Sequence, residues 1–163
     1  MKKTVALLVL AAGLGCAGLA QADSLGALRA AAERGSADAQ FDLALDYFDG
    51  DGVAQDRAQA AVWYRKAAEQ GYASAQNNLG MMYSDGEGVA QDDAQAVIWF
   101  RKAAAQGNPN AQTSLGWHYE SGKGVAQDDA QAVFWYRKAA SQGVAEAQEA
   151  LRMIDAGSRG ASK

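Results

Sequence analysis

Apolar residues recur along this chain with the spacing of amphipathic helices. Between residues 37 and 49, Ala39, Leu43 and Tyr47 lie four positions apart, so they share one face of a predicted helix. Glycines at positions 50 and 52 follow this segment, and glycine readily adopts the left-handed backbone conformation that ends a helix. The pattern therefore predicts a first helix that ends in a turn.

A second helix is predicted to start at Asp56. The Asp56 side chain can accept hydrogen bonds from free backbone N–H groups, and Gln59 can reach back toward it, as in a capping box. A glycine near the end of the segment suits a left-handed C-terminal cap. The buried face is predicted from the spacing i, i+3, i+4, i+7, which holds Ala60, Trp63, Tyr64 and Ala67.

This pair of predicted helices occurs three times without a gap, at a spacing of 36 residues. The tryptophan motif of the second helix begins at Trp63, Trp99 and Trp135, and these side chains are expected to fill the space between helices. Small residues on the first helix, Gly80 and Gly116, would let neighbouring helices approach closely. Stacked helical pairs with a fixed period are typical of solenoids. The chain is therefore predicted to be all-α, a solenoid of antiparallel helix pairs.

Incomplete repeats are predicted at both ends, because the terminal units of a solenoid must present one face to water. The last residues of the chain are expected to fray. The expected organisation is a signal segment at 1–22, an N-terminal capping helix at 23–36, repeats at 37–72, 73–108 and 109–144, a C-terminal capping helix at 145–157 and a tail at 158–163.

The recurring residues match the pattern A-x-x-x-L-G-x-x-Y-x-x-G-x-G-V-x-x-D, followed by A-x-x-W-Y-x-K-A-A-x-x-G. This pattern covers nearly the whole chain after residue 22 and resembles the Sel-1-like repeat family, a relative of tetratricopeptide repeats. The resemblance implies a right-handed superhelix and a scaffold or adaptor role in protein complexes, including those of the bacterial envelope and of exopolysaccharide regulation. It also implies that the motif residues determine the fold and do not form an active site.

Some cysteine-rich secreted members of that family have been credited with β-lactam binding or hydrolysis. The only cysteine of this chain is Cys16, so the paired cysteines of those relatives are absent. We therefore expect no enzymatic activity, and a small periplasmic hydrolase is the alternative that the resemblance leaves open.

The first 22 residues have the features of a bacterial export signal. Two lysines at positions 2 and 3 precede an apolar run at 5–14, and the sequence Ala-Gln-Ala at 20–22 has the small-x-small pattern of a cleavage site. Cleavage after Ala22 would release the mature chain into the periplasm. In the alternative interpretation, Cys16 becomes the lipidated first residue of a lipoprotein, and the protein is a lipid-anchored envelope component.

The full chain has a formal net charge of −4, which becomes −6 once the two lysines of the signal are removed. Contacts with phosphate groups need clustered lysine and arginine, so we expect no nucleic-acid partner. The same net negative charge disfavours binding to anionic membrane surfaces. We expect the mature chain to be a monomer that does not insert into a membrane.

Candidate catalytic and metal-binding residues are few. His118 is the only histidine, and Met82 and Asp46 take its place in the other repeats, so the repeat does not require an imidazole. A metal site needs several ligands, and neither a second histidine nor a cysteine of the mature chain can join His118. We expect no metal, no cofactor and no catalytic residue, with His118 neutral or exposed to solvent.

A variable face remains on the first helix of each repeat, opposite the predicted core. By analogy with related solenoids, this face would line a concave groove, and the function predicted for the chain is a periplasmic interaction scaffold or adaptor. In the alternative interpretation, Leu45, Met81 and Trp117 pack between repeats, which leaves the polar members exposed. The predicted partner-binding residues are Asp42, Leu45, Asp46, Asn78, Met81, Met82, Ser114, Trp117 and His118.

Overall fold

The computed structural model describes residues 24–160, with side chains described through residue 156, and within this range every regular element is a helix. The expected signal segment lies outside the described residues. Residues 24–33 are helical, and the helices that follow are α2 (Ala37–Asp49), α3 (Arg57–Glu69), α4 (Ala73–Asp85), α5 (Asp93–Ala105), α6 (Pro109–Ser121), α7 (Asp129–Ser141) and α8 (Ala145–Gly160).

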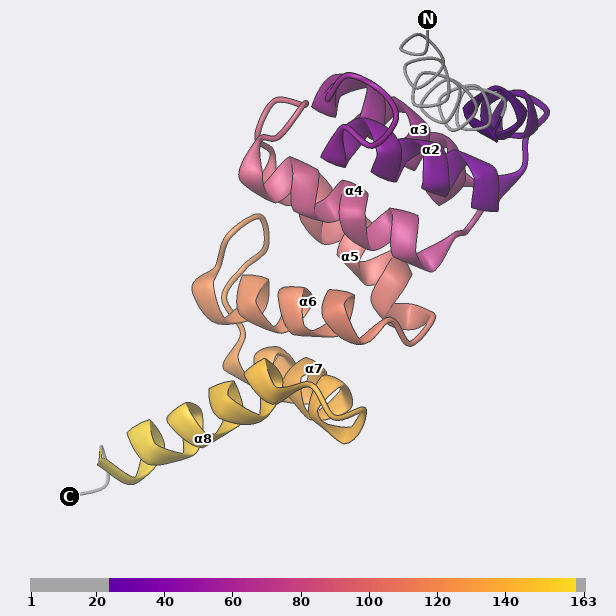
Figure 1. The fold of residues 1–163 in the computed structure, drawn as a ribbon. Helices are drawn as coiled ribbons and strands as arrows, with labels where there is room; N and C mark the ends of the chain where they lie inside the picture. Colours follow the sequence, from indigo (N-terminus) through magenta and orange to yellow (C-terminus); the bar gives the residue numbers. More distant parts are fainter. Residues whose placement is uncertain (1–23, 161–163) are drawn as a thin grey trace, which may run out of the picture.

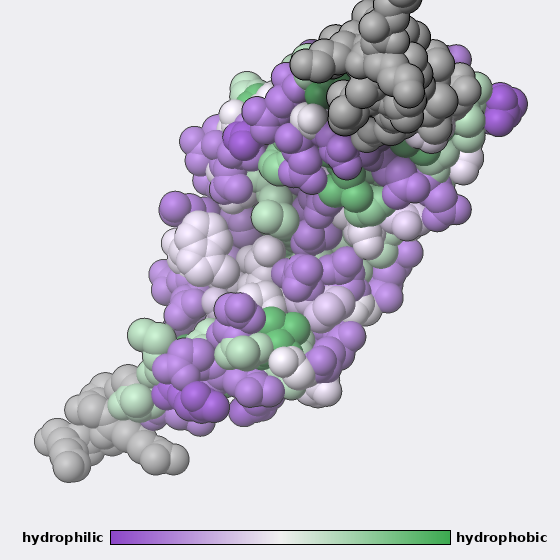
Figure 2. Space-filling model, in the orientation of Figure 1, coloured by the Kyte–Doolittle hydropathy of each residue, from purple (hydrophilic) through white to green (hydrophobic). Residues whose placement is uncertain are grey.

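The helices stack in chain order into an elongated solenoid, and on the face that Figure 2 shows hydrophilic side chains predominate with apolar ones between them. Within each repeat the two helices pack as a pair, namely α2 with α3, α4 with α5, and α6 with α7, while α3 packs on α4, α5 on α6 and α7 on α8. Figure 1 shows this progression from the helix at 24–33 at one end to α8 at the other. The predicted all-α solenoid is confirmed.

The second helix of each repeat starts at an aspartate, as predicted. The Asp56 carboxylate accepts a hydrogen bond from the Gln59 N–H at 3.0 Å, and the two later repeats have the same cap. The expected return bond from the Gln59 side chain is replaced, because the Asp56 N–H donates to the Tyr47 carbonyl oxygen at 2.8 Å. The cap therefore also ties the second helix to the end of the first.

Small residues on the first helices allow aromatic rings to lie against the backbone. A Cβ atom added to Gly80 would lie 2.7 Å from the Phe100 ring, and one added to Gly116 would lie 2.8 Å from the Tyr136 ring. Further along the turn, a Cβ atom on Gly88 would lie 2.2 Å from the carbonyl oxygen of Arg57 in the preceding repeat. Glycine is thus required both within a repeat and between repeats.

A buried ladder of glutamines explains the Ala-Gln pair that recurs at the start of each first helix. The Gln40 amide donates to the Ala32 carbonyl oxygen at 3.0 Å and accepts from Gln70 at 2.7 Å. The same two bonds recur around Gln76 and Gln112. Because each amide is buried and satisfied, the ladder fixes how one unit sits on the next.

The two ends differ from the inner repeats. α8 continues to Gly160, so the tail expected from residue 158 begins inside the helix. Arg152 occupies the position held by Gly80 and Gly116 in the inner repeats, and its exposed guanidinium pairs with Glu149 at 2.7 Å. A charged side chain thus stands where the earlier first helices receive an aromatic ring.

Candidate partner-binding groove

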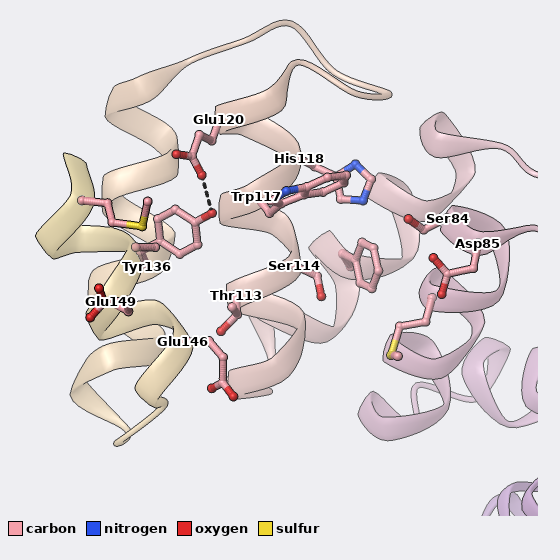
Figure 3. A pocket seen from close by; sticks show the side chains of 14 residues that line it. Ser84, Asp85, Thr113, Ser114, Trp117, His118, Glu120, Tyr136, Glu146 and Glu149 are labelled. Carbon is pink, nitrogen blue, oxygen red and sulfur yellow. Dashed lines mark hydrogen bonds between the residues drawn. The ribbon is translucent and has the colours of Figure 1, made fainter. Parts of the chain in front are cut away.

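A groove runs along the first helices of successive repeats. A hollow of about 790 Å³ lies among α4, α6 and α8, with Phe100 and Tyr136 of the second helices contributing to its lining (Figure 3). A second hollow of about 230 Å³ lies between α2 and α4. Met81 and Asp85 line both hollows, so the two form one groove.

An apolar side chain enters this groove from the same position of every first helix. Leu45, Met81, Trp117 and Met153 follow one another at intervals of 36 residues. Met81 is 47% exposed, Trp117 41% and Met153 68%, whereas Leu45 packs in part against the core. The alternative interpretation, that this set packs between repeats, therefore applies in part to Leu45 and fails for Met81 and Trp117.

Met82 and His118 are placed differently from the prediction. They are 2% and 1% exposed, so they belong to the floor of the groove, and the expectation that His118 stays accessible is wrong. The His118 Nδ1 atom lies 2.9 Å from the Lys123 carbonyl oxygen, and its ring packs against Phe100 and Trp117. This helix position faces the preceding repeat, which covers it.

Asp42 and Asp46 do not line the groove. Asp42 is exposed, and Asp46 is half-buried in a shallow hollow beside Leu25 and Leu28 of the helix at 24–33. Burial raises the pKa of Asp46, and repulsion from Asp51 and other nearby carboxylates raises it further. Within the described residues a single helix precedes α2, and the groove begins beyond these two residues.

Asn78 and Ser114 line the groove, as predicted. Beside Asn78, burial raises the pKa of the Tyr64 hydroxyl to about 12, despite an opposing hydrogen bond to Asn78. The hydroxyl therefore stays protonated at neutral pH and serves as a fixed polar group of the lining.

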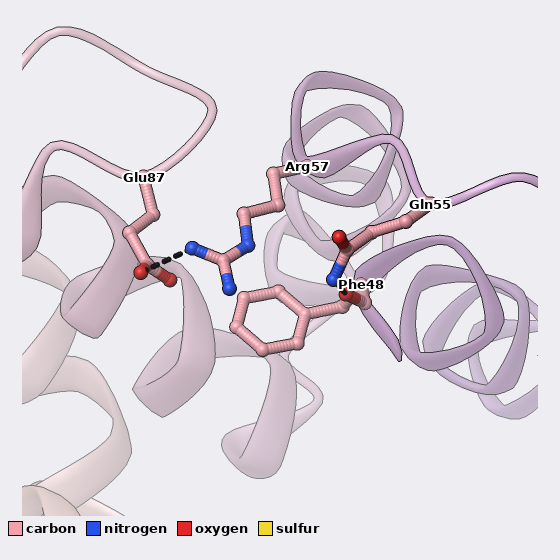
Figure 4. A network of polar contacts seen from close by, with 4 residues as sticks. All are labelled: Phe48, Gln55, Arg57 and Glu87. Atoms are coloured by element: carbon pink, nitrogen blue, oxygen red, sulfur yellow. Dashed lines mark hydrogen bonds and ion pairs between the residues drawn. The ribbon is translucent and has the colours of Figure 1, made fainter. Parts of the chain in front are cut away.

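Acidic side chains that the sequence analysis did not select surround the groove. Glu120 accepts a hydrogen bond from the Tyr136 hydroxyl at 2.7 Å (Figure 3), and burial together with this bond raises the pKa of Tyr136. Glu87 forms an ion pair with Arg57, whose guanidinium lies 5.0 Å from the centre of the Phe48 ring (Figure 4). The acidic lining residues are Asp49, Asp85, Glu87, Glu120, Glu146 and Glu149.

The contribution of α8 was also missed, although the sequence contains a signal for it. Met153 lies 36 residues after Trp117, so extending the repeat register into the terminal half-repeat would have selected it. The prediction considered only the three complete repeats, and the half-repeat closes the groove at its far end.

A family model described as Sel1 repeat matches residues 37–72, 73–108 and 109–144. The chain belongs to the Sel1 repeat family. The Sel1 repeat fold is commonly a protein–protein interaction scaffold, and proteins built from it are generally non-catalytic. A search of curated proteins finds no match.

Several solved structures resemble this Sel1 repeat chain. A protective antigen of uropathogenic Escherichia coli with an SLR fold is 49% identical with a TM-score of 0.75; the match covers 77% of this chain but only 27% of the antigen. A Sel1 repeat protein from Oxalobacter formigenes is 43% identical with a TM-score of 0.73, over 79% of this chain and 97% of that one. Helicobacter pylori cysteine-rich protein B is 22% identical with a TM-score of 0.62, over 81% and 95%, and shares the fold.

The lining of the groove in this Sel1 repeat chain combines apolar and acidic side chains. Among the described residues, no cluster of three histidine, cysteine or acidic side chains is arranged to hold a metal ion. None of the helices in the same range is long and apolar enough to cross a membrane. The groove presents a row of exposed apolar side chains, and acidic side chains border this row.

Proposed function

We propose that this Sel1 repeat chain is a periplasmic interaction scaffold that binds a partner protein in the groove along α2, α4, α6 and α8. The exposure of Met81, Trp117 and Met153 within a concave surface carries the proposal. Large apolar and aromatic side chains that are accessible in a groove are typical of the residues that supply most of the affinity at protein interfaces.

The environment of His118 supports binding over catalysis. Since a carbonyl oxygen only accepts hydrogen bonds, the His118 Nδ1–H donates to Lys123. In a nucleophilic triad the corresponding nitrogen is held by a carboxylate, and the other nitrogen faces a hydroxyl or thiol. His118 is instead buried against two aromatic rings, which suits a packing role.

The periplasmic location is proposed from the sequence. The lysines at positions 2 and 3, the apolar run and the Ala-Gln-Ala site support export and cleavage after Ala22. The alternative is retention at a membrane through a lipid on Cys16, which would leave the groove available to an envelope partner.

The double substitution Met81→Ser and Trp117→Ser tests the proposed function. Cross-linked partners captured from envelope extract would be quantified by mass spectrometry, and we expect capture by this variant to fall about tenfold or more. A matched control replaces two similarly exposed residues of the second helices, Ile98→Ser and Phe134→Ser. The control should capture normally, and both variants should keep the helical circular dichroism signal.

Two results would contradict the proposed function. In the first, the control loses capture while the groove variant keeps it, which would place the binding surface on the second helices. In the second, the purified protein hydrolyses a β-lactam with steady turnover, which would favour the enzymatic alternative.

A further inference from the structure

The charged side chains that line the two hollows of the groove are all acidic. Acidic side chains come from α2, α4, α6, α8 and the turn after α4, whereas none of the described lining residues is lysine or arginine. The second helices carry adjacent Arg-Lys pairs at 65–66, 101–102 and 137–138, all of them exposed.

Some of these acids already have a partner within the molecule. Glu87 pairs with Arg57, and Glu120 accepts the hydrogen bond from Tyr136. By contrast, Asp49, Asp85 and Glu146 are exposed and make no ion pair or side-chain hydrogen bond among the described residues. These three carboxylates can therefore receive a cationic group without breaking an existing contact.

The free carboxylates are distributed unevenly along the groove. Asp49 lines the hollow between α2 and α4, Asp85 on α4 lines both hollows, and Glu146 lies on α8. Between them, the Lys123 ammonium group lies 4.8 Å from the centre of the Trp117 ring. A cation is favoured at the two ends of the groove and disfavoured beside Trp117, where the exposed ring favours an apolar group.

We infer that the groove receives a cationic amphipathic segment of another protein, with lysine or arginine near both ends and apolar residues between them. This inference rests on the proposed function, because it specifies the partner of the same site. The basic groups lie against Asp49 and Asp85 at one end and Glu146 at the other. The apolar groups cover Met81, Trp117 and Met153. Complementary charge then selects the partner and sets its orientation, and the apolar centre supplies most of the affinity.

A synthetic peptide with lysines at both ends and leucine and alanine between them is the probe. Its binding to the purified mature protein would be measured by isothermal titration calorimetry at low and at physiological salt. We expect the lysine peptide to bind, and its affinity to fall as the salt concentration rises, because salt screens exposed charges. A peptide of the same length with glutamate in place of every lysine should not bind.

A charge-matched pair of variants separates the groove from the overall acidity of the protein. The groove variant, Asp85→Asn with Glu146→Gln, should bind the lysine peptide about fivefold more weakly at low salt. The control variant, Glu33→Gln with Glu69→Gln, removes the same charge from exposed positions outside the groove and should bind normally.

Equal weakening by both variants, or equal binding of the glutamate peptide, overturns the inference, since attraction would then be unspecific. If partner capture depends on Met81 and Trp117 but the lysine peptide does not bind, the inference fails and the proposed function stands. If the variant Met81→Ser with Trp117→Ser captures its partner normally, the proposed function fails, and the inference fails with it.

Discussion

One position of the first helix holds Asp46, Met82 and His118 in the three successive repeats. Its surroundings depend on the unit that comes before it. A complete repeat covers Met82 and His118, whereas the single helix at 24–33 leaves Asp46 partly open to water. A carboxylate is tolerated at this position only because the preceding unit is incomplete. The surroundings of Asp46 still disfavour the ionised form of its carboxyl group, and this has a measurable effect on the stability of the protein.

The substitution Asp46→Asn should stabilise the protein at neutral pH. The pKa of Asp46 is raised above its ordinary value, so the ionised form is less favourable in the folded chain than in the unfolded chain. Folding therefore loses stability as pH rises through the raised pKa, and asparagine removes that loss. We expect a small gain near neutral pH, because solvent screens the charge of a side chain that is only partly buried.

Thermal melts at two pH values would check this expectation. The advantage of Asp46→Asn should vanish below the ordinary pKa of 3.8, where the carboxyl group is protonated in both states. Glu33→Gln, which removes a carboxylate from an exposed position, is the control. An advantage of the same size at both pH values would contradict the electrostatic explanation.

A glycine-to-alanine change should have opposite effects at two helical sites. At Gly80 the new methyl group would meet the Phe100 ring at 2.7 Å, so the ring or the helix must move, at a cost of about 1–3 kcal/mol. At Gly26 nothing lies within 4 Å, and alanine should stabilise the helix by about 0.5–1 kcal/mol. Urea unfolding of both variants would measure the difference, and destabilisation of similar size at both sites would refute the packing explanation.

Among the second helices, α5 is the one with a complete repeat on each side. Its tryptophan, Trp99, is buried and packs into the same apolar cluster as Ala44 and Leu79 of the first two repeats, while Trp63 and Trp135 remain half-buried. Each ring carries a lysine ammonium group over its face, as Lys102 does over Trp99 at 4.1 Å. The tryptophan motif therefore contributes most to packing in the repeat that has a complete repeat on each side.

Replacing Trp99 with alanine should destabilise the chain by about 3–5 kcal/mol, because it leaves a cavity between two repeats. Val62→Ala, at an exposed position of α3, is a suitable control and should change stability by less than about 0.5 kcal/mol. Equal unfolding midpoints for the two variants in urea would contradict the cavity argument.

The period of the sequence determines which parts of the whole molecule could be predicted. Helix pairs, their aspartate caps and the close approach at Gly80 depend on residues near one another in the chain, and these predictions are confirmed. The burial of His118 and the entry of Met153 into the groove depend on which unit is stacked next to them. A pattern within one repeat does not contain that information. The acidic border was missed because only Asp49 and Asp85 share a repeat position, while its other members occupy different positions in different repeats.

Export of the chain stays a prediction and has a direct test. Mass spectrometry of the exported protein should find Asp23 as its first residue, because cleavage is expected after the Ala-Gln-Ala sequence. A diacylglycerol-modified Cys16 at the N-terminus would contradict this and would indicate a lipoprotein.

Arg152 determines how a solenoid of this kind can be made longer. Since it fills the site where the next ring would dock, extra units appended after α8 would meet a bulky charged side chain instead of a glycine. A duplicated copy of residues 109–144 inserted ahead of α8 would find compatible neighbours on both sides. To lengthen the binding groove, new repeats should therefore be inserted before α8 and not appended after it.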